Sequence, residues 1–452
     1  MESQTKLTFQ ETDGAGNPTA TFVYSEQGGS SKRVGRVDAI SSSPPTSWSA
    51  KPLITSLSDV FLPSGYPHSV SDDYLPSIAG LLSSRAVLQG TAPRPSASPA
   101  QLTAPGVGVG NPDASPTSAL LLHILQDTSG RIATILFAHR VGTALEPECK
   151  TYRLAADVFN DIAMILDCLS PGVPAGAMRV TVLSTAGVLR ALCGVAGGSS
   201  KASLSAHFAK WGNLAELNAK DSSQETIISL FGMLVGSVVV SQITGFTTTW
   251  LVLLVLLGLH LGMNYAAVRA VQMTSLNRQR ANIAFSALLD SDKGVESTQW
   301  AVLTPAQVAS QESIFHRDGA LQWMAGSTSV YLGSARVGVP MAAFVAEKPP
   351  LGRLAGLFSG EAYLLYLSEK RHVSVVLKKG CSVQDQLKAW AHGLLAVKSW
   401  DGSSDVIDVI EESLAFLNEG DRFGAYLVKL RAVGWNVEIA ALETRSGRRI
   451  DI

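Results

Sequence analysis

Charged residues are scarce in this sequence, and one long stretch lacks them altogether. Asp, Glu, Lys and Arg make up 16% of the 452 residues, whereas soluble domains average roughly 25%. Residues 226–268 contain none of the four, and their only imidazole is His260. These 43 residues are too many for one membrane helix and match two helices joined by a tight turn. The sequence therefore predicts a transmembrane helical hairpin, the alternative being a hairpin buried in a large soluble core.

Cysteine pairs and long runs of charge are also lacking. The four cysteines are scattered and form no C-x-x-C pair, which argues against a zinc site or a disulfide framework and favours a reducing compartment. The formal net charge is −1 with no long basic run, so we expect no nucleic acid partner. The N-terminal residues lack the apolar segment of a secretory signal. We therefore expect the internal hairpin to direct membrane insertion.

The usual phosphate-binding and catalytic motifs are missing as well. There is no G-x-S-x-G elbow, and no G-x-G-x-x-G lies on a suitable strand-to-helix turn. Segment 194–201 is glycine-rich, but Ser200 precedes Lys201 where a phosphate loop requires Gly, and Ala202 follows where it requires Ser or Thr. Two interpretations of this segment stay open: an anion site at a helix N-terminus, and a tight turn or close helix packing.

Three ionisable residues share one face of a predicted helix. Arg153, Asp157 and Asp161 are spaced at i, i+4 and i+8, so an ion pair explains them more simply than a cation site. We accordingly predict no catalytic residues, no metal site and no cofactor, and hence no enzyme.

The predicted hairpin has a defined start and two spans of membrane length. Ser222 and Glu225 form a capping box directly before the apolar run. Segments 226–243 and 250–268 would be about 27 and 28 Å long as helices, each close to the thickness of a bilayer core. Both ends of the hairpin carry positive charge, which places both on the cytoplasmic side; the residues are Lys201, Lys210 and Lys220 before it and Arg269, Arg278 and Arg280 after it.

Small and polar residues recur within the two spans. Each span has a G-x-x-x-G motif, which allows close helix packing in lipid; the glycines are Gly232, Gly236, Gly258 and Gly262. His260 and Asn264 lie one turn apart near the middle of the second span. Such a pair should face protein or a water-filled path. It is therefore either a proton or ligand contact, or an interhelical hydrogen bond.

The predicted fold is mainly α: a multi-helix membrane domain with a central transmembrane hairpin, followed by a small α+β C-terminal domain. The domains are a β-rich arm and linker at 1–50, the helical membrane domain at 51–290 with a disordered Pro/Ser/Ala-rich insertion at 91–105, an irregular linker at 291–350, and the α+β domain at 351–452. The arm has strands at 6–10 and 19–24.

Periodicity gives the elements of the two larger domains. The membrane domain should have helical segments at 118–127, 131–140, 154–169 and 175–194, the first two being separate helices or halves of a bent one. The C-terminal domain should follow the order β-β-α-α-α-β, with elements at 362–367, 372–377, 382–397, 405–417, 421–433 and 436–443.

Six ordered blocks of sequence resemble the root UV-B sensitive (RUS) family of eukaryotic membrane proteins. They are FLPSGYPHSVSDDYLP, LLHILQDTSGRIATILFAHR, YRLAADVFNDIAM, VAGGSSKASLSAHFA, NLAELNAKDSSQET and LHLGMNYAAVRA. The resemblance covers roughly residues 59–285 and is closest to filamentous-fungal members. It implies a multi-helix membrane protein without established catalytic residues, and its plant members imply roles in UV-B responses, seedling development and vitamin B6 homeostasis.

The sequence departs from the family pattern at two places. A helical segment expected after the DDYLP block is missing beyond Pro76, and residues 91–105 interrupt a run that the family reads continuously. A skipped exon and a retained intron would explain both departures. Sequencing the transcript across residues 74–110 tests this explanation.

Two functions follow from these observations. The first is a non-enzymatic, multi-pass membrane protein that supports vitamin B6 homeostasis or stress and development signalling, with the lipid bilayer and another family member or membrane complex as partners. The second is a transporter of a small polar or anionic solute. Candidate polar or ligand contacts for either function are Lys201, His207, Asn213, Lys220, Asp221, Gln224, Glu225, His260, Asn264 and Arg269.

Overall fold

The computed structural model divides the chain into two compact units, which are considered separately. One unit comprises residues 1–76 and 272–452, and the other residues 77–271. The structure describes residues 6–12, 18–27, 34–41, 116–174, 176–209, 214–215, 232–239, 241–243, 245–292, 300–326, 328–444 and 447–451. Outside these residues lie the capping box at Ser222–Glu225, the insertion at 91–105 and the departure after Pro76.

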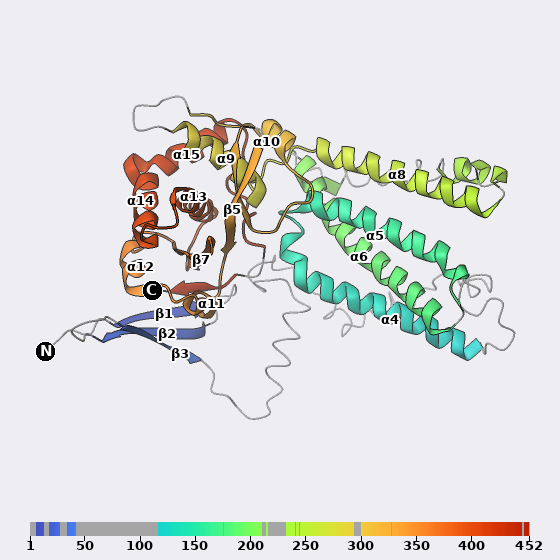
Figure 1. Ribbon diagram of the computed structural model, residues 1–452, viewed down its shortest axis with the longest axis horizontal. Coiled ribbons are helices and arrows are strands. Elements are labelled where there is room, and N and C mark those ends of the chain that lie inside the picture. The colour runs from blue at the N-terminus through green and yellow to red at the C-terminus, as the bar shows by residue number, and fades with distance from the viewer. Residues whose placement is uncertain are drawn as a thin grey trace. The chain divides into compact units, whose positions relative to one another are not determined.

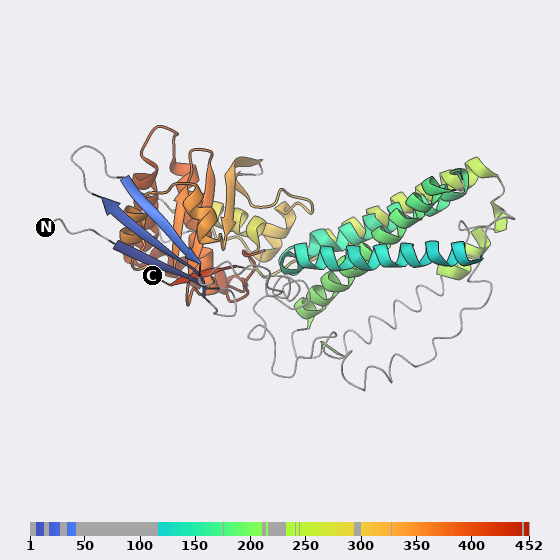
Figure 2. The ribbon, with the colours of Figure 1, turned by 90° about the horizontal axis from the view of Figure 1, so that it is seen from below.

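The helical unit (residues 77–271) is built from long helices that lie side by side (Figures 1 and 2). Its principal helices are α4 (Pro116–Val141), α5 (Cys149–Leu169), α6 (Ala177–Phe208) and α8 (Phe246–Ala270), with short 3-10 turns η2 (Gly142–Ala144) and η3 (Ser170–Gly172) between the first three. The segments predicted at 118–127 and 131–140 form the single helix α4. The segment predicted at 154–169 is confirmed as α5.

Glycines let the helices of this unit approach closely at two points. A Cβ added to Gly197 of α6 would lie 3.6 Å from the Cβ of Ala156 on α5, and one added to Gly130 of α4 would lie 3.5 Å from the Cβ of Ala191 on α6. Glycine inside a helix costs about 1 kcal/mol relative to alanine. Close packing offsets this cost, so α6 continues through its glycines and ends only at Phe208.

This continuity corrects two expectations about segment 194–201. The segment lies in the interior of α6, not in a turn and not at a helix N-terminus. Interior backbone N–H groups are already bonded within the helix, so the anion site proposed there is wrong. Close helix packing, the other interpretation, is confirmed at Gly197.

The predicted hairpin is described in part. Residues 232–239 and 241–242 of the first span are helical, and the second span is confirmed as a helix, α8. At Gly232, Gly236, Gly258 and Gly262 an added Cβ would meet no atom within 4 Å. The close helix approach expected at these four glycines is therefore not made by the described part of the chain.

The second unit (residues 1–76 and 272–452) is a mixed sheet covered by helices, and is called the sheet unit below. The strand order is β3-β2-β1-β8-β7-β5-β4, with β6 also paired to β7; β5 and β8 run parallel to β7, and the other pairs are antiparallel. The strands are β1 (Lys6–Thr12), β2 (Pro18–Gln27), β3 (Val34–Ser41), β4 (Ala320–Ala325), β5 (Thr328–Val337), β6 (Tyr363–Leu367), β7 (His372–Lys378) and β8 (Arg449–Asp451).

Seven helices are described in the sheet unit: α9 (Arg278–Ser291), α10 (Pro305–Gln311), α11 (Met341–Ala346), α12 (Leu351–Leu357), α13 (Val383–Ser399), α14 (Val406–Asn418) and α15 (Arg422–Ala432). Figure 1 shows α13, α14 and α15 beside the orange-red strands. The helices predicted at 382–397, 405–417 and 421–433 are confirmed as α13, α14 and α15, and the predicted hairpin is β6 and β7. Leu387, Trp390 and Leu394 are buried, and their i, i+3 and i+7 spacing places them on one face of α13.

Three expectations about the sheet unit are wrong. Residues 291–350, expected as an irregular linker, contain α10, β4, β5 and α11. The final strand is β8 and not 436–443, because Val437 is buried while Ile439 is 41% exposed, which breaks the alternation that a strand there needs. The N-terminal arm is not a separate region, since Gln10–Thr12 of β1 pair with Arg449–Asp451 of β8.

The expected domain boundary at residue 290 is also displaced. Helix α9 lies in the sheet unit, where nearly all its residues are buried. The Asn282 side chain accepts a hydrogen bond from Trp390 Nε1 on α13 (2.9 Å) and donates one to the Ala320 carbonyl at the start of β4 (2.7 Å). Its polar sequence is thus satisfied within a core, which explains why composition alone did not place it there.

A candidate polar site in the helical unit

Three ionisable residues of α5, Arg153, Asp157 and Asp161, form a stripe along one helix face. Arg153 Nη1 donates to Asp157 Oδ1 at 2.9 Å, the ion pair that the i, i+4 spacing predicted. Asp161 follows one turn later, and both aspartates are buried, at 8% and 3% exposure. A buried carboxylate is stable only when it is paired or hydrogen-bonded.

The partner of Asp161 comes from α8. His260 Nδ1 lies 3.1 Å from Asp161 Oδ2, and the Asp161 side chain is 4% exposed while that of His260 is 42% exposed. Because an ionised carboxylate only accepts, the ring N–H at Nδ1 is the donor. The two residues are 99 positions apart in the sequence. This contact confirms the interhelical hydrogen bond that was one interpretation of His260.

Two carboxylate oxygens of the stripe have no partner. Asp157 Oδ2 and Asp161 Oδ1 are buried without a hydrogen bond in the described part of the protein. An unsatisfied buried acceptor costs roughly 1–3 kcal/mol and more when it is charged. The thiol of Cys193 on α6 is within electrostatic range of both aspartates and of Arg153. Helices α5, α6 and α8 therefore surround two buried carboxylates, each of which has one oxygen without a hydrogen bond in the described part of the chain.

The remaining predicted contacts are dispersed. Lys201 and His207 lie on α6, and the His207 ring contacts Phe208 with centroids 5.3 Å apart. Asn264 follows His260 by one turn, and Arg269 lies in the last turn of α8. The other five fall outside the described residues: Asn213, Lys220, Asp221, Gln224 and Glu225. Of the candidate residues that the structure describes, His260 is hydrogen-bonded to Asp161. The sequence had grouped Asp161 with Arg153 and Asp157 and not with His260.

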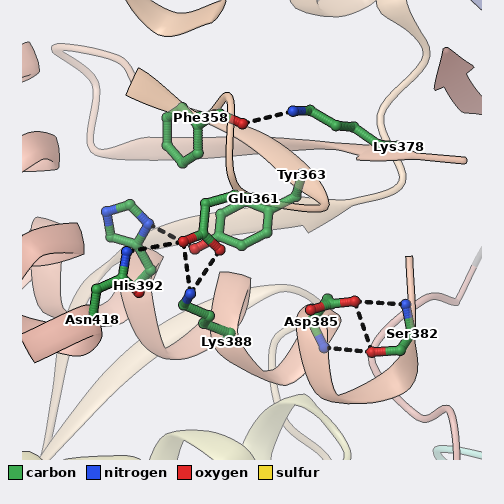
Figure 3. A network of polar contacts seen from close by, with 9 residues as sticks. All are labelled: Phe358, Glu361, Tyr363, Lys378, Ser382, Asp385, Lys388, His392 and Asn418. Carbon is green, nitrogen blue, oxygen red and sulfur yellow. Dashed lines mark hydrogen bonds and ion pairs between the residues drawn. The ribbon is translucent and has the colours of Figure 1, made fainter. Parts of the chain in front are cut away.

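The sheet unit has its own polar network, which Figure 3 shows from close by. Glu361 accepts from Lys388 Nζ at 2.7 Å on both oxygens and from Asn418 Nδ2 at 3.0 Å. Nearby, Tyr363 OH donates to His392 Nδ1 at 3.1 Å, and His392 Nε2–H donates to the Ile410 carbonyl at 3.0 Å. This arrangement fixes the neutral tautomer of His392, because both ring nitrogens are used.

Burial sets the ionisation of this network. It raises the pKa of Tyr363 well above its ordinary value, and it lowers the pKa of His392 to about 4. Burial also lowers the pKa of Lys378, whose Nζ donates to the Phe358 carbonyl at 2.6 Å. These groups join α12, β6, β7, α13 and α14 across the core and leave Tyr363 and His392 neutral at physiological pH. We interpret the network as structural.

The exposed surfaces of the two units differ. Most large hydrophobic side chains that are exposed lie in the helical unit, whereas the sheet unit buries a continuous apolar core. Two helices, α6 and α8, are long and apolar enough to cross a membrane, and only 11% of each apolar segment is buried. A core helix of a soluble protein would be mostly buried. The helical unit therefore has an apolar surface, whereas the sheet unit has an apolar core. The protein as described is mostly helical, with a mixed sheet in the sheet unit.

Comparisons with known proteins assign this combination to a family. Residues 47–292 match the family described as "Vitamin B6 photo-protection and homoeostasis domain", and residues 301–448 match "Root UVB sensitive protein, C-terminal". The chain belongs to the root UVB sensitive (RUS) family. No solved structure matches it.

Three similar proteins come from a slime mould and a plant. The chain is 37% identical over 274 residues to "RUS family member 1" of Dictyostelium discoideum, which covers 57% of this chain and 47% of that protein. It is 30% identical over 396 residues to "Protein root UVB sensitive 3" of Arabidopsis thaliana, covering 84% and 82%. It is 24% identical to "Protein root UVB sensitive 2, chloroplastic" of the same plant, covering 85% and 82%. The fungal-type subgroup stays a prediction.

Proposed function

We propose that this protein is a multi-pass membrane protein that is not an enzyme and that supports vitamin B6 homeostasis as part of a membrane complex. The observation that carries the membrane part is the exposed apolar surface of α6 and α8. Burying such a surface in lipid removes the cost of holding it in water. The vitamin B6 part rests on the family described for residues 47–292.

Deleting the gene in its source organism tests the role in homeostasis. We expect pyridoxal phosphate pools to fall and growth to become dependent on added pyridoxine. The matched control restores the gene with Val428→Ser, which changes an exposed side chain of the sheet unit (62% exposed) and should rescue fully. Unchanged pools and growth in the deletion strain would remove the vitamin B6 part while leaving the membrane part standing.

A second function, transport of a small polar or anionic solute, is favoured by one observation. The Asp161–His260 contact places a carboxylate and an imidazole between α5 and the membrane-length helix α8. Polar pairs at such positions mark solute or proton paths in membrane proteins. Uptake of pyridoxine and pyridoxal phosphate by proteoliposomes tests this function with His260→Ala and Lys201→Ala. His139→Ala, at the exposed end of α4, is the control. Transport requires that wild type and control take up solute and that His260→Ala does not.

A further inference from the structure

Few large hydrophobic side chains reach the surface of the sheet unit, and they are unevenly distributed. Five are exposed among its described residues: Phe315, Val330, Tyr331, Val428 and Ile439. Three of the five lie between Phe315 and Tyr331, and the Phe315 side chain is 58% exposed. A single exposed hydrophobic residue is ordinary on a protein surface, whereas a group of them marks a site of interaction. The surroundings of Phe315 therefore matter.

Phe315 lies between two acidic residues that are bonded to the start of α9. Glu312 Oε1 accepts from Arg280 Nη1 at 3.4 Å, and both side chains are buried. Asp318 Oδ1 accepts from Arg278 Nη2 at 2.6 Å. These two ion pairs hold the loop of Phe315 against the first turn of α9 while the phenylalanine side chain stays exposed.

A second loop, residues 436–443, is bonded to the segment just before α9. The Asn436 backbone N–H donates to the Thr274 carbonyl at 2.9 Å, and Asn436 also forms a β-bridge with Ser275. This loop carries Ile439, another of the exposed hydrophobic residues. Two loops that expose an apolar side chain are therefore bonded to the same short part of the chain, residues 274–280.

That part of the chain follows α8 directly. Ala270 is the last residue of α8, which is long and apolar enough to cross a membrane. Thr274 comes four residues later, and a fully extended chain of that length spans at most about 14 Å. The headgroup region outside the apolar core of a bilayer is roughly 5–8 Å thick on each side. With α8 in a bilayer, the loop bonded to Thr274 thus begins close to the lipid surface.

The charges beside Phe315 suit a lipid surface. Arg317 Cζ lies 5.2 Å from the centroid of the Tyr331 ring, and no carboxylate is paired with Arg317 in the described part of the chain. Arginine and tyrosine are suited to a membrane–water interface because each has an apolar body and a polar end. The neighbouring carboxylate of Asp318 is already paired with Arg278. The Arg317 guanidinium is therefore available to a phosphate, to which it can donate two parallel hydrogen bonds.

We propose that loops 312–319 and 436–443 form a membrane-contact surface, in which Phe315 and Ile439 enter the headgroup region and Arg317 binds a lipid phosphate. The occupant of this surface is the bilayer, because both loops are bonded to the segment that follows a membrane-length helix. This contact rests on the proposed membrane function, since the bilayer that α8 crosses supplies the lipid. It would restrict the rotation of the sheet unit about the residues that follow α8.

Spin labels on the full-length protein in lipid nanodiscs test the surface. Single cysteines are introduced as Phe315→Cys, Ile439→Cys, Leu259→Cys on α8, and Ala415→Cys at an exposed position of α14, in a protein whose own cysteines are replaced. Power-saturation EPR compares the contact of each label with oxygen, which concentrates in lipid, and with a nickel chelate, which stays in water. We expect an oxygen-to-nickel ratio several-fold higher at the first three positions than at Ala415→Cys.

A second comparison tests the role of Arg317. In the Phe315→Cys protein, Arg317→Gln should lower the oxygen-to-nickel ratio, because the side chain no longer binds a phosphate. The matched control is Arg353→Gln on α12, an exposed arginine paired with Asp405, which should leave the ratio unchanged. A ratio that Arg317→Gln does not change would remove Arg317 from the contact.

The four labelled positions separate the possible failures. Contact with nickel at Phe315→Cys and Ile439→Cys, together with contact with oxygen at Leu259→Cys, would overturn the membrane-contact surface and leave the proposed membrane function standing. Contact with nickel at all four positions would overturn the proposed membrane function as well. Little contact with either reagent at Phe315→Cys would show that a protein, such as a second copy of this chain, covers the loop, and would overturn the assignment to lipid.

Discussion

The buried imidazole of His392 makes the stability of the sheet unit dependent on pH. Its pKa lies at about 4 in the folded protein, against 6.5 for an exposed histidine. Between about pH 4 and pH 6.5, the His392 ring therefore binds a proton in the unfolded chain but not in the folded chain. Stability from this group is fully present above about pH 6.5 and is lost as the pH falls towards 4. At about 1.4 kcal/mol for each pKa unit, the loss is about 3 kcal/mol.

His392→Gln separates this effect from the titration of other groups. The variant loses the hydrogen bonds to Tyr363 and Ile410 and should be less stable at neutral pH, but it has no imidazole to protonate. Hydrogen exchange of α13 amides reports the local free energy of opening, in the full-length protein held in detergent. We expect the difference between wild type and variant to shrink by about 3 kcal/mol from pH 7 to pH 4. A difference that stays constant over this range would show that His392 does not make the stability of the sheet unit depend on pH.

Three further predictions concern packing. Gly197→Leu should destabilise the α5–α6 contact by about 1–3 kcal/mol, because its Cβ would already touch Ala156. Gly198→Leu should not, because a Cβ at Gly198 meets no atom within 4 Å. Thermal unfolding in detergent compares the two variants. Glu11→Ala should cost about 1–3 kcal/mol in urea unfolding, because buried Glu11 accepts from the Met341 backbone N–H at 2.8 Å, whereas exposed Gln10→Ala should cost little. A fragment of residues 301–452 should be cut rapidly by protease because it lacks α9 and β1, and a fragment of 272–452 mixed with a peptide of residues 1–41 should resist.

Local pattern was enough to predict several elements of the fold. Helix α13 begins at a capping box of Ser382 and Asp385 and buries Leu387, Trp390 and Leu394 on one face, and both features are visible in the sequence. The second apolar span was predicted in the same way, since its composition alone requires a long helix. The hydrophobic pattern predicts an element correctly when the residues that define it lie within that element.

Long-range pairing could not be predicted in this way. Strand β8 has three residues, and its partners on β1 lie more than 400 positions away, so neither strand shows its pairing locally. Helix α9 has a polar sequence, and its buried polar side chains bond to residues of other elements, such as Trp390. The sequence of the helix alone does not show these partners. The contact of His260 with Asp161 likewise joins two helices that each gave a separate signal. The sequence pointed to Asp161 and His260 separately, but it could not show that the two side chains are in contact.

Cysteine labelling in membranes measures directly whether α8 is exposed to lipid. Single cysteines at Leu251 and Leu259 of α8 and at Val428 of the sheet unit, all strongly exposed, are placed in a protein whose own cysteines are replaced. Opened membranes are treated with a charged maleimide that reacts only in water. We expect rapid labelling at Val428→Cys and protection of both α8 positions until detergent is added. Equal labelling at all three positions before detergent would show that α8 lies in water and not in lipid.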